Sequence, residues 1–143
     1  MENRDNALNF FKQQYNCSQS VFAAYAGKYG INENDALKVA AAFGGGIGRT
    51  QDICGALTGA VMTIGCKYFD SKDPAGSKVL VYNKTKELLA KFKDKNNSID
   101  CLNLTGVDLS TEKGQELFKT LNVHENKCNG YIEDVCRILD EMI

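Results

Sequence analysis

The residues best suited to chemistry in this chain are its six cysteines. Their thiolates attack disulfides and bind metal ions. No two cysteines have the C-x-x-C spacing, so a local redox pair of the thioredoxin type is absent. A functional cluster must therefore be assembled by folding from distant segments. The six are Cys17, Cys54, Cys66, Cys101, Cys128 and Cys136.

Four of the cysteines are expected near helix starts or in loops. A helix start offers unpaired N–H groups and a partial positive charge, and both favour thiolate over thiol. The four, which we take as candidate redox or metal-binding residues, are Cys17 at the start of a helix, Cys54 just inside a helix, Cys101 in a loop and Cys128 before the last helix. Cys66 and Cys136 lie in apolar stretches and are expected in the core.

A glycine cluster, Gly44-Gly45-Gly46-Ile47-Gly48, precedes Arg49 and leads toward Cys54. The amides of Gly45, Gly46 and Gly48 and the side chain of Arg49 are candidates to stabilise a negative cluster or a thiolate. The alternative is a tight turn between two helices. No strand is expected before it, and it lacks a Walker lysine and a complete G-x-G-x-x-G, so a nucleotide-binding loop is rejected.

Other catalytic arrangements find no support in the sequence. His124, the only histidine, stands in a polar segment, so we expect it on the surface and outside the site. No Ser–His–Asp set or carboxylate pair is indicated, and whether the protein is an enzyme stays open.

The pattern around these residues predicts an all-α fold, a single-domain bundle of about six or seven helices over residues 1–143. Apolar residues recur at helical spacing and no alternating run marks a strand. Asn16 or Ser18 and Asn32 or Asn34 are candidate N-caps. The expected helices cover about 8–15, 17–29, 35–43, 51–69, 74–95, 111–121 and 129–143, with a loop over 99–107 and a cap at Ser110.

Composition and charge limit the possible partners and the compartment. Seventeen basic and eighteen acidic side chains leave a net charge of −1, so neither nucleic acid nor a membrane surface is expected as a partner. The longest central run without a charge, 53–66, is shorter than the roughly 20 residues of a spanning helix. The N-terminus lacks the apolar run of a secretory signal, so we expect a cytoplasmic protein.

Two short motifs and four further residues give the chain a resemblance to a known family. Phe43-Gly44-Gly45-Gly46-Ile47-Gly48 and Cys54-Gly55-Ala56-Leu57-Thr58-Gly59, with Asn16-Cys17 upstream and Cys101 and Cys128 downstream, resemble the redox-active protein family named for its C_GCAxxG_C_C pattern. The resemblance implies a helical domain whose characteristic set is Cys17, Cys54, Cys101 and Cys128. A similar four-cysteine domain occurs in split-Soret cytochromes c, where it is thought to hold an iron–sulfur cluster. C-x-x-C-H is absent here, so covalently attached haem is excluded.

The leading hypothesis is a redox-active protein whose four cysteines converge. They would bind an iron–sulfur cluster, for which four thiolates are the usual ligand set, or undergo reversible thiol/disulfide exchange. The first alternative is a structural zinc site. The second is a helical module for a ligand or partner, with merely buried cysteines. We expect a redox partner of unknown identity and allow for a homodimer.

Overall fold

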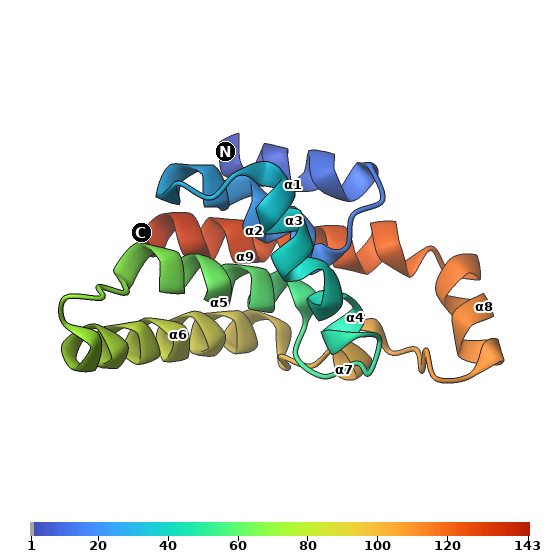
Figure 1. Ribbon diagram of the computed structural model, residues 1–143. Coiled ribbons are helices and arrows are strands. Elements are labelled where there is room, and N and C mark those ends of the chain that lie inside the picture. The colour runs from blue at the N-terminus through green and yellow to red at the C-terminus, as the bar shows by residue number, and fades with distance from the viewer. Residues whose placement is uncertain (1) are drawn as a thin grey trace.

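The computed structural model describes residues 2–143, and most of them lie in helices (Figure 1). The helices are α1 (Glu2–Lys12), α2 (Cys17–Ala26), α3 (Glu33–Ala40), α4 (Gly44–Ile47), α5 (Gly55–Tyr68), α6 (Pro74–Asn96), α7 (Cys101–Thr105), α8 (Glu112–Thr120) and α9 (Asn129–Met142). Over these 142 residues no strand forms, and the only extended pairing is an isolated bridge between Ile53 and Asp100. The all-α class is therefore confirmed.

The expected number of helices was too small. Segment α4 is not a regular helix, because Gly45 and Gly46 have φ of 64° and 70°, so eight regular helices remain in the described part of the chain. The additional helix is α7, which occupies the expected loop over 99–107. It has only five residues and begins because the side chain of Asp100 accepts a hydrogen bond from the backbone N–H of Asn103. Such a short helix leaves no apolar periodicity to recognise.

Side-chain caps fix most helix starts. Asn16 and Gln19 form a reciprocal capping box at the start of α2, and Asn32 caps α3. Asp73 caps α6 immediately before its proline. Helix α8 is capped by Thr111 and not by the expected Ser110. Because the caps at Asn16 and Asn32 match the expectation, the entry of the chain into both helices follows from local sequence.

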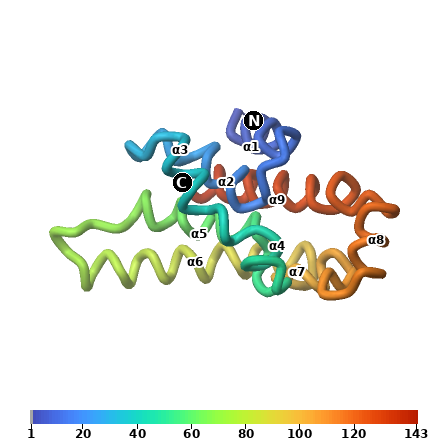
Figure 2. Tube along the Cα trace, turned by 45° about the vertical axis from the view of Figure 1, so that its right-hand side comes forward, coloured from blue at the N-terminus to red at the C-terminus, as the bar shows by residue number. Residues whose placement is uncertain are grey.

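Helix α5 is the central element. It packs against α2 on one side and against α6 and α9 on others (Figures 1 and 2). A Cβ atom built on Gly59 would lie 2.8 Å from the Ser18 carbonyl oxygen and 2.9 Å from the Val21 Cβ, so only glycine lets α2 approach this closely. The small residues of α5 thus admit the backbone of a neighbouring helix.

The two remaining cysteines differ in burial. Cys136 of α9 is fully buried, as expected for a core residue. Cys66, near the end of α5, is only half-buried and packs beside the small cluster that includes Phe22 and Ala36. In the part of the chain that is described, no helix is both long enough and apolar enough to cross a membrane.

Candidate functional site

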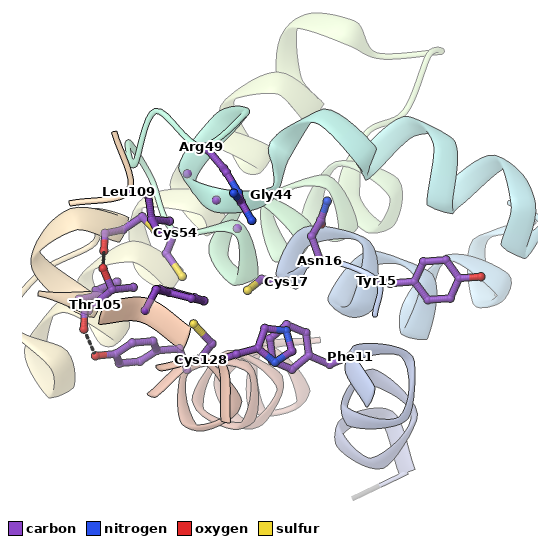
Figure 3. Close-up of a pocket in the computed structure, with 18 of the residues that line it drawn as sticks. Phe11, Tyr15, Asn16, Cys17, Gly44, Arg49, Cys54, Thr105, Leu109 and Cys128 are labelled. Atoms are coloured by element: carbon purple, nitrogen blue, oxygen red, sulfur yellow. Dashed lines mark hydrogen bonds between the residues drawn. The ribbon is translucent and has the colours of Figure 1, made fainter. Parts of the chain in front are cut away.

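One pocket, with a volume of about 390 Å³, is lined by four cysteines that are far apart in the sequence. They come from the beginning of α2, the beginning of α5, the beginning of α7 and the turn before α9. Figure 3 shows the sulfur atoms of Cys17, Cys54 and Cys128 directed toward a common space. The structure thus brings together all four cysteines that the sequence singled out, namely Cys17, Cys54, Cys101 and Cys128.

Backbone pairing places Cys54 beside Cys101. The Cys54 N–H donates to the Ile99 carbonyl at 2.8 Å, and the Cys101 N–H donates to the Asp52 carbonyl at 2.7 Å. Cys54 is the N-cap of α5, so the helix begins at Gly55 and not near residue 51 as expected. The extended segment before Cys54 is held by this pairing between distant parts of the chain, which local sequence does not reveal.

Cys17, the first residue of α2, lies against the start of α5. A Cβ atom on Gly55 would stand 3.1 Å from the Cys17 Cβ and 3.2 Å from the Ser18 nitrogen. The two helix starts approach this closely because Gly55 has no side chain. The same small residue that follows Cys54 therefore determines how near Cys17 comes.

Cys128 directly precedes α9, as expected. The chain is already helical from Val123, and His124–Cys128 forms one π-helical turn that continues into α9. The expected position is therefore confirmed, but α9 continues a helical segment and does not begin with a free N-terminus at Cys128. The Asn129 N–H donates to the His124 carbonyl, one residue further back than in an α-helix. Single π-turns of this kind are frequent at functional sites, because the extra residue changes where the side chains point.

Cys17 and Cys128 line the same pocket, and each thiol shifts the pKa of the other. Interaction with the Cys128 sulfur, together with burial, raises the pKa of Cys17 well above its ordinary value. The same interaction lowers the pKa of Cys128, and the ammonium group of Lys127 contributes in the same direction. Cys128 therefore loses its proton first, and Cys17 stabilises the resulting thiolate.

Burial is the largest cause of the pKa shifts at the other two cysteines, Cys54 and Cys101. It raises the pKa of Cys54 to about 12, although the N–H groups of Ala56 and Leu57 oppose the shift. It raises the pKa of Cys101 to about 11, against a hydrogen bond from Gln51. A helix start was expected to favour thiolate, but at both positions loss of water outweighs the helix dipole. These two thiols are protonated at neutral pH.

The glycine cluster forms a left-handed turn at the pocket wall. Residues 45–49 all have positive φ, including Ile47 at 70° and Arg49 at 64°. A Cβ atom on Gly45 would be 2.8 Å from the Arg49 Cγ, so the missing side chain gives the arginine room to fold back over the turn. The turn also contributes Gly46 and Gly48 to the pocket lining. The segment is both a tight turn and part of the site.

Sequence reasoning missed His124 as a pocket residue. Its ring stacks on the Phe11 ring with centroids 3.7 Å apart, and both line the pocket. Burial lowers the pKa of His124, so the ring is neutral at physiological pH. The four-residue interval between His124 and Cys128 places both on one helical face, and that spacing was a usable signal.

Gln51 was also missed, as the buried residue that organises this end of the pocket. Its side-chain amide donates to the Val107 carbonyl at 2.7 Å and reaches the Cys101 sulfur at 4.0 Å. Its side-chain oxygen accepts from the Leu109 N–H at 2.8 Å. Gln51 has a φ of 58° and is almost fully buried. No sequence pattern distinguishes such a glutamine from a surface one.

The lining of the pocket combines aromatic rings with a single charge. Among the described residues, Arg49 is the only charged side chain at its wall and no Asp or Glu lines it. In the same range, no three His, Cys, Asp or Glu side chains are grouped in the way that would hold a metal ion. The aromatic residues are Phe11, Tyr15, Phe118 and Tyr131.

Comparison with known proteins yields one match, which covers most of the chain. The family model described as "Putative redox-active protein (C_GCAxxG_C_C)" matches residues 15–142. The matched span contains all four pocket cysteines and the glycine turn. No curated protein and no solved structure matches the chain.

Proposed function

The chain belongs to the C_GCAxxG_C_C family of redox-active proteins, and from this premise we propose that its four-cysteine pocket performs thiol/disulfide exchange through Cys128 and Cys17. The observation that carries the proposal is that Cys17 and Cys128 line one pocket, where each thiol shifts the pKa of the other. This arrangement makes Cys128 the more acidic sulfur and places a second thiol within reach of it. A nucleophilic thiolate with an adjacent resolving thiol is the arrangement that reduces disulfides.

The exchange has two balanced steps. The Cys128 thiolate attacks one sulfur of a substrate disulfide, which forms a mixed disulfide and releases the first substrate thiolate. Cys17 then loses its proton to solvent and attacks the Cys128 sulfur, which closes the Cys17–Cys128 disulfide and releases the second thiolate. The substrate gains two electrons, and the two protein thiols lose them. Cys54 and Cys101 stay protonated, because burial raises their pKa values to about 12 and about 11.

Disulfide mapping tests this proposal directly. We expect oxidation in a graded thiol/disulfide buffer to produce one reversible disulfide, between Cys17 and Cys128, before any other thiol is lost. Peptide mass mapping after alkylation reads out the pairing, and the transition midpoint gives the reduction potential. Oxidation that begins at Cys54 or Cys101, or slow alkylation of all six cysteines without a reversible pair, would contradict it. The second result would favour a ligand-binding module with buried cysteines.

The number and type of the pocket sulfurs match an iron–sulfur cluster, which is our second candidate, although no three of them are grouped as a metal site among the described residues. Four cysteine sulfurs are the usual ligands of such clusters, and here four cysteines line one pocket of about 390 Å³. When bound, a cluster supplies one-electron transfer. To bind it, the cysteine thiols must lose their protons, because the ligands are thiolates. Cys54 and Cys101 would have to lose tightly held protons, because their pKa values are about 12 and about 11.

Metal loading at different pH values tests this second candidate. We expect anaerobic incubation with iron and sulfide to release protons and to proceed more completely at pH 9 than at pH 7, because ligation requires four thiolates. Visible absorption and electron spin resonance identify a cluster. Protein that takes up neither iron nor sulfide at either pH would exclude this form. Stoichiometric zinc in native mass spectra, with unfolding on chelation, would indicate a structural metal site instead.

A further inference from the structure

The only charge on the pocket wall among the described residues belongs to Arg49, and it suggests a substrate class. We propose that the pocket takes small disulfides carrying an anionic group, and that Arg49 binds that group while Cys128 attacks the disulfide. This inference rests on the proposed exchange function and adds the identity of the substrate. The experiment below separates a failure of one from a failure of the other.

The position of Arg49 is determined by the left-handed turn. Because Gly45 has no Cβ, the Arg49 side chain packs across it, with its Cγ only 2.8 Å from where that atom would be. Figure 3 shows the guanidinium end directed toward the space beside Cys17. Arg49 itself has a φ of 64°, a conformation that is costly for a residue with a side chain. The backbone of this turn thus brings a cation to the mouth of the pocket.

The charge of Arg49 has no counterion among the residues that the structure describes. Within residues 2–143 its guanidinium takes part in no ion pair, and no carboxylate lines the pocket. Lys127 lies close enough to Cys128 to lower its pKa, so a second positive charge acts on the same region. An anion that enters the pocket therefore meets a positive charge at its wall. Guanidinium groups bind carboxylates through two parallel hydrogen bonds, which also fixes the orientation of the bound molecule.

The remaining lining limits the size and character of the substrate. A volume of about 390 Å³ accommodates a small molecule and not a folded protein segment. The stacked pair Phe11 and His124 presents ring surface near Cys128, and the neutral histidine adds no repulsion or attraction for charge. An anionic disulfide with a flat or apolar body matches both features. Cationic disulfides would be repelled by Arg49 and Lys127.

Two aromatic disulfides that differ in charge test the inference. The probes are 5,5′-dithiobis(2-nitrobenzoate), which carries two carboxylates, and the neutral 4,4′-dithiodipyridine. We expect Arg49→Gln to lower the rate constant for the anionic probe about tenfold, the effect of losing one charge-assisted hydrogen bond. The rate constant for the neutral probe should stay within about twofold, since its attack on Cys128 needs no anion site. Released aryl thiolate is followed by absorbance in a Cys66→Ser background, which removes the half-buried thiol outside the pocket.

Matched controls and salt complete the test. Lys38→Gln, which removes an exposed cation on α3, should leave both rate constants unchanged. High salt should slow the anionic probe in the protein with Arg49 and have little effect once Arg49 is replaced. Equal effects of Arg49→Gln on both probes, or no effect on either, would overturn the inference about the substrate and leave the exchange function standing. If neither probe produces the Cys17–Cys128 disulfide, the exchange function fails and the inference falls with it.

Discussion

Replacing Cys128 by serine should slow disulfide reduction by this protein by at least about 1,000-fold, because a hydroxyl group is not a competent nucleophile toward sulfur. Cys128 is the pocket thiol whose pKa is lowered, through the proton that Cys17 shares with it. The reaction rate should rise with pH and level off below pH 9.0, the ordinary pKa of the thiol, since the thiolate is the reacting form. Stopped-flow measurements with a chromogenic disulfide between pH 5 and 10 give both quantities.

Two further variants keep this prediction falsifiable. Cys136→Ala removes a buried thiol from α9 outside the pocket lining, and it should leave the rate and its pH profile unchanged. Cys17→Ser should still react once but should stop at the mixed disulfide, which mass spectrometry detects as an adduct on Cys128. Cys17→Ala, which removes the donor altogether, should also move the pH profile upward, because the stabilising proton of Cys17 is lost. An unaltered rate in Cys128→Ser would show that another thiol is the nucleophile.

Local signals in the sequence account for the parts of the fold that depend on neighbouring residues. Asn16 and Asn32 cap helices because their side chains bond to backbone groups three residues ahead. Gly30 directly follows the expected helix over 17–29, and its left-handed conformation ends the turn after α2. Both features require no information about the rest of the chain, and both were predictable for that reason.

The features that were missed depend on contacts between distant segments. Cys54 lies before its helix because residues 52–54 pair with 99–101, and nothing near Cys54 indicates that pairing. Gln51 is buried for the same reason, since its amide holds the chain at Val107 and Leu109. The raised pKa of Cys54 follows from burial in the assembled pocket. A helix-start rule, which considers only local dipoles, gives the opposite direction.

Cys128 owes its lowered pKa to a source that the sequence did not indicate. It was selected as a cysteine at a helix start, yet it lies in a continuous helix at a π-turn. Its lowered pKa comes first from Cys17, which is 111 positions away in the sequence. Tertiary contact therefore supplies the acidity that was attributed to the helix end. The same contact supports the exchange function over the reading of merely buried cysteines.

The contact between α2 and α5 holds Cys17, the first residue of α2, in the pocket. Gly59→Ala should disrupt this contact between the two helices. The added methyl group would lie 2.8 Å from the Ser18 carbonyl oxygen, 2.9 Å from the Val21 Cβ and 3.2 Å from the Phe22 nitrogen. Two of these neighbours are backbone atoms, which cannot rotate away, so α2 must shift. We expect the free energy of unfolding to fall by about 3 kcal/mol, which corresponds to a decrease in Tm of about 10 °C.

Gly65→Ala provides the matched control on the same helix. A Cβ atom at Gly65 meets nothing within 4 Å, so alanine should stabilise α5 by up to about 1 kcal/mol through its higher helix propensity. Opposite signs for one chemical change would show that contact with α2, and not helix propensity, determines the effect at Gly59. Urea denaturation measures both, and equal effects would contradict the packing argument. Because Cys17 begins α2, Gly59→Ala should also slow closure of the Cys17–Cys128 disulfide, whereas Gly65→Ala should not.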